Sequence, residues 1–159
     1  MTHKAKTNAM RMLDAAKLKY KSYEYNINEG FTSGSDIARQ EELDPDIVFK
    51  TLVTTAGKDL YFVFVIPVDC KLNLKKAAAC TGVKKLEMLP SKELLGITGY
   101  IHGGCSPIGM KKAFPTIYDE TAKLYEKIFV SGGRIGLHIE IEPELLARIT
   151  DGKFADITE

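Results

Sequence analysis

Four glycines fall within the eleven residues from Gly99 to Gly109, and Lys111 and Lys112 follow closely. A stretch so rich in glycine disfavours helix and strand and favours a loop. The bare amide N–H groups of such a loop can bind an anion or a ligand oxygen. The stretch has neither the Gly-Lys-Ser/Thr ending of a Walker loop nor the GxGxxG spacing of a dinucleotide site. By itself the pattern predicts either a ligand-binding loop or a series of plain turns.

Two side chains of this loop have the chemistry of a nucleophile. Cys105 follows His102 by three residues, so a Cys–His pair is one hypothesis, and a small filler beside Pro107 is the alternative. Ser106 precedes a proline and lies outside a GxSxG pattern, so we expect it to start a turn. The three histidines of the chain have no Cys, Asp or Glu partners at metal-binding spacing. We therefore expect neither a metal nor another cofactor.

Lysines provide the second kind of candidate chemistry. Lys50 stands at the head of a predicted strand, where it is either a solvated surface charge or a cation that holds a phosphate or a developing oxyanion. Further lysines are grouped as Lys71/Lys75/Lys76, Lys84/Lys85 and Lys111/Lys112. Such groups contact RNA in some proteins and only increase solubility in others. The net charge of +1 does not by itself require a nucleic-acid partner.

The composition limits the class of protein. With 159 residues, 45% hydrophobic and 27% charged, the chain suits one soluble globular domain covering residues 1–159. Its three cysteines are scattered without a CxxC pair, which fits a reducing cytoplasm and gives no disulfide framework. The N-terminus lacks the apolar core of a signal peptide. The longest apolar run, Leu60–Val68, is too short to span a bilayer, so we expect no membrane partner.

Local patterns predict the elements that must position these residues. Apolar spacing predicts a helix over residues 4–17, and caps predict helices from Ser33 or Ser35 to Glu42, at Asp44-Pro45, over 74–80 after Asn73, over 92–95 after Ser91 and over 143–149. Alternation and β-branched residues predict strands over 23–27, 48–55, 60–66, 114–118, 127–131, 137–141 and 154–157, and a loop over 28–34. The second and third strands read as a hairpin. Because the order lacks a regular βαβ rhythm, we expect an α+β domain with a mixed sheet, partly curled towards a barrel.

Three motifs in a fixed order resemble the YbaK-type proteins and the related editing domain of bacterial prolyl-tRNA synthetases. They are Phe49-Lys50-Thr51-Leu52, then Thr98-Gly99-Tyr100-x-x-Gly103-Gly104-x-Ser106-Pro107-x-Gly109, then Val130-Ser131-Gly132-Gly133-x-x-Gly136. Tyr25 and the stretch 74–78 also look like positions of this family. The resemblance extends over nearly the whole chain, and it implies mixed strands in a partly barrel-like sheet surrounded by short helices.

The resemblance also implies an activity, the hydrolysis of misacylated tRNA and chiefly of Cys-tRNA(Pro). A pocket that discriminates between small apolar groups gains only ~1–3 kcal/mol, so a separate hydrolase that clears the error is needed. The substrate implied is the aminoacylated 3′ end of a tRNA. Prolyl-tRNA synthetase is implied as a partner, and no DNA partner is expected. In such Cys-specific proteins the substrate thiol attacks the ester carbonyl, which explains why no enzyme nucleophile stands out here.

Roles for individual residues follow from the resemblance. Lys50 would hold the region of the 3′ phosphate and ribose and orient the ester, and the amides near Gly103 and Gly104 would face the ester oxygen. Residues expected to line the substrate site are Tyr25, Thr51, Gly99, Tyr100, Ser106, Pro107, Ser131, Gly132 and Gly133. His138 and Cys105 stand at positions that vary in the family, and the resemblance assigns them no role.

Two other functions stay open at this point. One is an editing deacylase with a different amino-acid specificity, for alanine or serine. The other is a regulator that binds tRNA or a synthetase without turnover. Loss of hydrolysis in Lys50→Ala with a retained fold would separate an enzyme from a binding protein.

Overall fold

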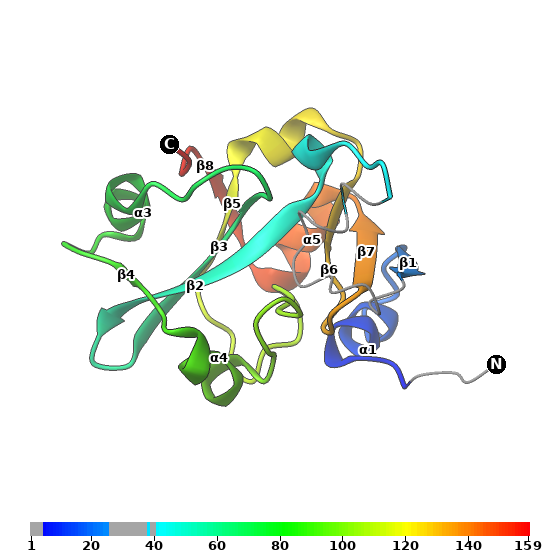
Figure 1. Cartoon of the computed structure of the whole chain (residues 1–159), viewed down its shortest axis with the longest axis horizontal. Coiled ribbons are helices and arrows are strands. Elements are labelled where there is room, and N and C mark those ends of the chain that lie inside the picture. The colour runs from blue at the N-terminus through cyan, green and yellow to red at the C-terminus, as the bar shows by residue number, and fades with distance from the viewer. Residues whose placement is uncertain (1–4, 26–37, 39–40) are drawn as a thin grey trace.

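The structure is a computed structural model that describes residues 5–25, 38 and 41–159. The expected α+β class with a mixed sheet is confirmed, and its strands form a three-stranded and a five-stranded sheet with short helices around them (Figure 1). No helix among the described residues is both long and apolar enough to cross a membrane.

The three-stranded sheet is antiparallel, in the order β1–β7–β6. Its strands are β1 (Lys21–Glu24), β7 (Leu137–Ile141) and β6 (Ile128–Ser131). Ile139 and Ile141 point into the main hydrophobic core. Because side chains alternate along a strand, His138 and Glu140 point to the opposite face.

The five-stranded sheet has the order β4–β2–β3–β5–β8. Its strands are β4 (Glu87–Met88), β2 (Phe49–Gly57), β3 (Leu60–Pro67), β5 (Thr116–Asp119) and β8 (Lys153–Ala155). β2 and β3 form the predicted antiparallel hairpin, whereas β3, β5 and β8 run parallel. This combination makes the sheet mixed, and β8 lies at its edge as expected.

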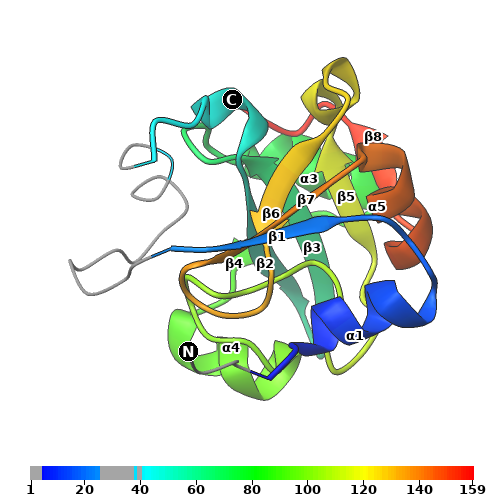
Figure 2. The same ribbon diagram turned by 90° about the vertical axis from the view of Figure 1, so that its right-hand side faces the viewer.

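The two sheets meet where β6 runs beside the start of β2. Val48, just before β2, forms a parallel bridge with Phe129 of β6. Figure 2 shows the β1–β7–β6 sheet passing in front of the β2–β3 hairpin. The strands therefore curl around a common core, but β1 and the outer strands of the larger sheet do not pair, so the described strands do not close into a barrel.

The helices are short and most begin at the predicted places. They are α1 (Asn8–Ala15), the 3-10 turn η1 (Pro45–Ile47), α3 (Leu74–Thr81), α4 (Ser91–Thr98), the 3-10 turn η2 (Glu120–Leu124) and α5 (Pro143–Thr150). Asn73 accepts hydrogen bonds from the N–H groups of Lys75 and Lys76, and Asp44 accepts one from Asp46, as expected for capping residues.

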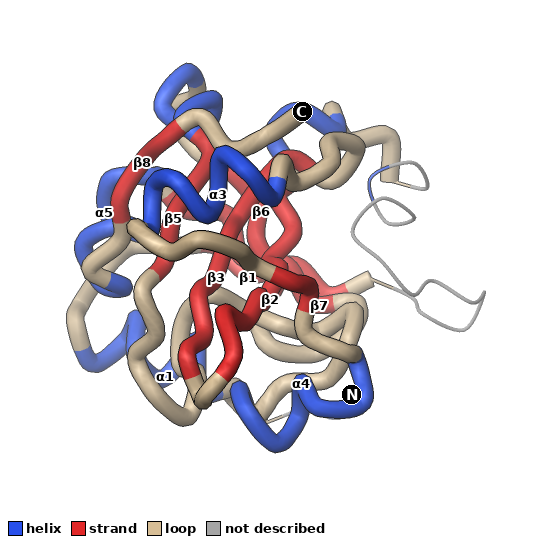
Figure 3. The backbone as a smooth tube through the Cα atoms, turned by 90° about the vertical axis from the view of Figure 1, so that its left-hand side faces the viewer, coloured by secondary structure: helices blue, strands red, loops and turns tan. Residues whose placement is uncertain are grey.

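Hydrophobic packing fills both sides of the hairpin. The main core includes Phe49, Val65 and Ile139, so it is shared by both sheets. On the other side α3 packs Ala77 and Ala78 against β3 and β5, and Figure 3 shows α3 crossing this face. A third, smaller cluster contains Ala38, Val48, Val68 and Phe129, and it covers the outer face of β6.

Some predicted boundaries need correction. The helix expected to stop at Gly96 continues to Thr98 and ends at Gly99, whose φ of +88° is left-handed. Ser91 is its first residue rather than its cap, because no side chain caps this N-terminus. The short strand β4 and the turn η2 were not predicted. Ile27, the loop over 28–34 and the caps at Ser33 or Ser35 lie outside the described residues.

Candidate functional site

Lys50 lies at the start of β2 and is partly buried. Burial lowers the pKa of its ammonium, while Cys70 and Asp69 act in the opposite direction. Within the described chain, no hydrogen-bond acceptor or carboxylate pairs with this ammonium. A partly desolvated cation without a protein partner is poised to bind an anionic or polar oxygen of a ligand.

The contact between the sheets places Lys50 next to the second glycine-rich motif. Val48 and Phe129 are bridged in parallel register. Lys50 of β2 and Ser131 of β6 each lie two residues beyond a bridged residue. Side chains two residues apart share a face of a strand, so Lys50 and Ser131 lie on the face that carries Val48 and Phe129. The structure thus brings together two residues that are far apart in the sequence.

From Ser131, a row of neighbouring side chains on this face continues across the three-stranded sheet. Ser131 is paired with His138 of β7, and His138 is paired with Tyr23 of β1. The ring of Tyr25 stands edge-on to the His138 ring, with 5.3 Å between the centroids. Tyr25 is fixed there by its N–H, which donates to the Gly136 carbonyl at 2.7 Å.

Burial raises the pKa of the Tyr25 hydroxyl to about 12, and the charges of Glu41 and Glu140 act in the same direction. This end of the row is therefore electronegative, whereas the Lys50 end is positive. The Ser131 hydroxyl between them accepts a hydrogen bond from the Gly133 N–H at 3.2 Å.

Thr51 follows Lys50 on the opposite face of β2. Its hydroxyl oxygen is buried and has no hydrogen-bond partner among the described residues. A buried hydroxyl without a partner is costly to a folded protein, so its presence needs an explanation. Thr51 shares its face with Phe49 and Val53, which belong to the main core.

The two glycine-rich segments are in direct contact. A Cβ on Gly104 would come within 2.9 Å of the backbone of Arg134 and Ile135. Gly133 has a φ of +109° and lies against Thr7 and the ring of Tyr100. The close approach of the two backbones needs a residue without a side chain at Gly104, and so the first loop is held against the turn that follows Ser131.

The two amides of the Gly99–Gly109 loop that were expected to bind the ester differ in whether they are already hydrogen-bonded. The Gly104 N–H donates to the Ile101 carbonyl at 3.0 Å, which closes a turn. The Gly103 N–H has no acceptor in the part of the chain that the structure describes. Of the two amides expected to face an ester oxygen, the Gly103 amide is thus the available one.

The remaining residues expected in the site support the shape of this loop. Gly99 ends α4, and the Tyr100 hydroxyl donates to the Ile108 carbonyl at 2.7 Å. Ser106 is fully buried with Pro107, and its hydroxyl accepts the Ile108 N–H at 3.2 Å, which is the expected turn.

Cys105 is buried in the main core, and burial raises the pKa of its thiol to about 12. His102 is exposed and makes no hydrogen bond with it. The geometry therefore favours Cys105 as a small filler over a Cys–His nucleophile. No three His, Cys, Asp or Glu side chains within the described ranges gather closely enough to hold a metal.

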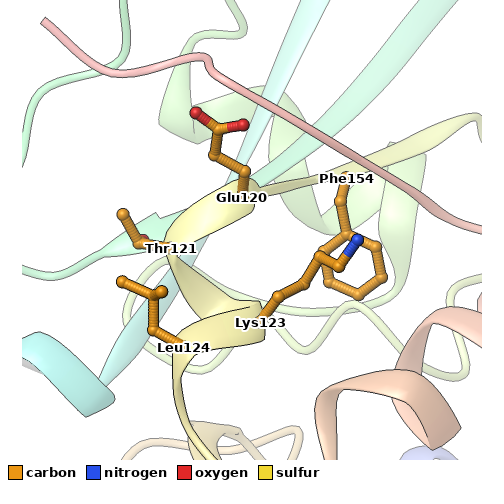
Figure 4. A pocket seen from close by; sticks show the side chains of 5 residues that line it. All are labelled: Glu120, Thr121, Lys123, Leu124 and Phe154. Carbon is orange, nitrogen blue, oxygen red and sulfur yellow. The ribbon is translucent and has the colours of Figure 1, made fainter.

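A pocket on another part of the surface is unrelated to these motifs. It is lined by η2 and by Phe154 of β8, and the Lys123 ammonium lies 5.4 Å from the centre of the Phe154 ring (Figure 4). None of the residues expected in the site lines it.

The fold agrees with the comparison with known proteins. The model of the family described as the aminoacyl-tRNA editing domain matches residues 28–149. This match spans more than half of the chain, so the protein belongs to the aminoacyl-tRNA editing domain family.

Individual relatives fit this assignment. A protein of Enterococcus faecalis named as a candidate Cys-tRNA(Pro)/Cys-tRNA(Cys) deacylase, EbsC, is 48% identical over 153 residues, which cover 96% of this chain and 93% of that protein. The crystal structure of a candidate trans-editing enzyme for prolyl-tRNA synthetase has a TM-score of 0.82 at 22% identity, covering 98% of this chain and 99% of that one. A hypothetical protein reaches a TM-score of 0.87 at 22% identity over 96% of this chain and all of that one. The two structural matches show the fold.

Proposed function

We propose that the protein is an aminoacyl-tRNA deacylase that removes cysteine from misacylated Cys-tRNA(Pro). The name of the relative that is 48% identical supports this substrate, and membership of the editing family supports the reaction class. The observation that carries the proposal is the partly buried ammonium of Lys50, which has no partner among the described residues and follows the bridge to β6 by two residues. An ester of tRNA presents the phosphate and carbonyl oxygens that such a cation binds.

The reaction needs no nucleophile from the enzyme. The substrate thiol loses its proton and its sulfur attacks the ester carbonyl carbon, which forms a C–S bond and a tetrahedral oxyanion. Collapse of this intermediate breaks the bond to the ribose oxygen, which takes up a proton. The products are a cysteine thiolactone and deacylated tRNA, and water then opens the thiolactone. Holding the thiol near the carbonyl and stabilising the oxyanion are the tasks left to the protein.

Several groups of the site receive roles in this reaction. Lys50 binds the terminal phosphate and ribose region and favours the developing negative charge. The Gly103 N–H donates to the oxyanion, and the Gly104 amide, already bonded to Ile101, sets the turn that aims it. Tyr25 forms one wall of the site. Ser131, Gly132 and Gly133 form the rim against which the first loop rests.

The remaining elements of the proposal concern the cellular setting. Lysines of the groups named above are available to contact the tRNA body, since Lys75, Lys111 and Lys112 are exposed. With a net charge of +1, affinity for tRNA alone is expected to be weak. Delivery of the substrate by prolyl-tRNA synthetase in the cytoplasm would raise its effective concentration.

Deacylation of tRNA(Pro) charged with cysteine, alanine or serine tests the proposal, with trapping of the thiolactone. We expect rapid loss of cysteine alone, and a 100-fold or greater fall in rate for Lys50→Ala, in the range of about 10²–10³ for loss of an oxyanion contact. Lys92→Ala is the matched control, because Lys92 is exposed in α4 and belongs to none of the lysine groups.

Other results would redirect the assignment. Hydrolysis of the alanine or serine esters would make water the nucleophile and indicate a deacylase of different specificity. Absence of hydrolysis with all three substrates would overturn the enzyme proposal in favour of a binding protein.

A further inference from the structure

His138 is a buried histidine to which neither the sequence motifs nor the reaction above gives a task. Its side chain is 4% exposed. Its Nδ1 atom is buried and has no hydrogen-bond partner in the described structure. A buried polar atom is normally paired, and because His138 adjoins the candidate site, a partner that arrives with the ligand would account for its unpaired Nδ1.

The surroundings of His138 belong to the candidate site. Ser131 is opposite it on β6, and Tyr23 is opposite it on β1. The ring of Tyr25 lies edge-on, and the Phe129 ring is 6.2 Å away between centroids. Ser131 and Lys50 each lie two residues beyond the Val48–Phe129 bridge, so His138 lies on the same face as the proposed ester-binding cation.

The electrostatic setting of His138 favours a cationic donor. Burial alone lowers the pKa of the imidazole to about 4, so the ring is neutral and can accept a hydrogen bond near neutral pH. The titratable groups facing this region are Tyr23, Tyr25, Glu41 and Glu140, with Lys50 at the far end of the row. The Tyr23 hydroxyl donates to Glu140 at 2.9 Å, which holds that negative charge in place.

The two ends of the row differ in the charge they attract. The Lys50 end suits phosphate and ester oxygens, whereas the end with neutral His138 and the carboxylates suits an ammonium. An aminoacyl ester carries these two groups on neighbouring atoms, since its α-ammonium is one carbon from the carbonyl. The order of charges along the row matches the order of groups in this ligand.

We propose that His138 is a positioning residue whose neutral imidazole accepts a hydrogen bond from the α-ammonium of the aminoacyl group. This proposal rests on the deacylase function proposed above and adds to it. Anchoring the ammonium at His138 while Lys50 binds the ester end fixes the rotation about the bond between the α-carbon and the carbonyl. The side chain of the amino acid is then directed towards the carbonyl carbon, where a thiol can attack.

A substrate without the amino group tests this role. Cys-tRNA(Pro) is compared with 3-mercaptopropionyl-tRNA(Pro), which keeps the thiol and the ester. Because the ammonium itself activates an ester, the decisive quantity is how the preference in kcat/KM changes between variants. We expect His138→Leu to reduce the preference for the cysteine ester at least tenfold relative to the wild type. His138→Asn, which restores a polar acceptor, should recover part of it.

Further measurements separate this role from a structural one. Thermal unfolding checks that both variants are folded. Equal slowing of the two substrates in His138→Leu, with an unchanged preference, would overturn the proposal and leave His138 as a packing residue.

Binding of two stable amides, 3′-cysteinylamino-adenosine and its 3-mercaptopropionyl counterpart, gives a readout without turnover. The wild type should bind the first more tightly, by a factor that falls at least fivefold in His138→Leu. Failure of the wild type to hydrolyse Cys-tRNA(Pro) would reject the deacylase function, whereas equal affinity of the wild type for the two amides would reject the role of His138.

Discussion

Val48 and Phe129 form the parallel bridge that joins the two sheets, and the candidate site is organised around it. From this bridge the register leads to Lys50 on one strand and Ser131 on the other. The antiparallel pairing of β6 with β7 then adds His138 to the same row. The positive and the electronegative ends of the site are thus set by backbone pairing rather than by flexible loops.

The hydroxyl of Thr51 should be dispensable for stability. Thr51→Val keeps the shape of the side chain and removes a buried oxygen without a partner, so the free energy of unfolding should rise by about 1 kcal/mol. Thr54→Val is the matched control, because the Thr54 hydroxyl donates to the Phe62 carbonyl at 3.0 Å and its loss should cost about 1 kcal/mol. Urea unfolding of both variants measures the difference, and equal destabilisation would contradict it.

The contact between the two glycine-rich segments should not tolerate a methyl group. In Gly104→Ala the new Cβ meets the backbone of Arg134 and Ile135 at 2.9 Å. We therefore expect the free energy of unfolding to fall by about 1–3 kcal/mol and deacylation to be slower. Gly96→Ala is the control, since a Cβ there meets nothing within 4 Å inside α4. The free energy of unfolding of Gly96→Ala should rise by up to about 1 kcal/mol, because alanine has a higher helix propensity than glycine. A stable and fully active Gly104→Ala would show that the loop can move away from the turn.

His138 should make the protein sensitive to mild acid. Its pKa of about 4 in the folded state lies below the ordinary value of 6.5, so the unfolded chain binds more protons between these values. The contribution of the neutral His138 ring to the free energy of unfolding is complete above pH 6.5 and is lost as the pH falls towards 4. Between pH 7.5 and pH 5 the loss amounts to about 2 kcal/mol. His138→Leu should lose that much less stability over the same interval, as measured by urea unfolding at both pH values.

Removing the charge of Lys50 should separate stability from activity. Its ammonium is partly buried and has no partner within residues 5–25, 38 and 41–159, so Lys50→Met should raise the midpoint of thermal unfolding while deacylation is lost. Lys92→Met removes an exposed charge and should leave both properties close to those of the wild type. A lower melting temperature for Lys50→Met would mean that the ammonium stabilises the folded state.

Local signals predicted much of the fold. The cap at Asn73 and the turn after β2 act within a few residues, and the structure has them as expected. The strand β4 has two residues, and its pairing with Thr54 and Thr55 comes from distant sequence. The end of α4 was misplaced because Gly96 weakens a helix without stopping it, and packing of Leu94 supports the continuation.

The site could be predicted residue by residue but not as an arrangement. The motifs pointed to Lys50, Ser131 and the glycines, yet their proximity depends on the bridge between strands some 80 residues apart in sequence. His138 received no role from the sequence, because its position varies in the family that the chain resembles. The cluster around Val48 and Phe129 covers its face of β7, which buries the histidine. A polar residue on a strand with two covered faces is the signal that reveals it.

The pairing of β1 with β7 also governs when the protein can act during its own synthesis. Lys21 is matched with Glu140, and Glu24 with Leu137, so the first strand waits for a partner made more than 100 residues later. Contacts of such long range form slowly and only after both segments have left the ribosome. A nascent chain therefore carries Lys50 without its surroundings until β7 has been made and has left the ribosome.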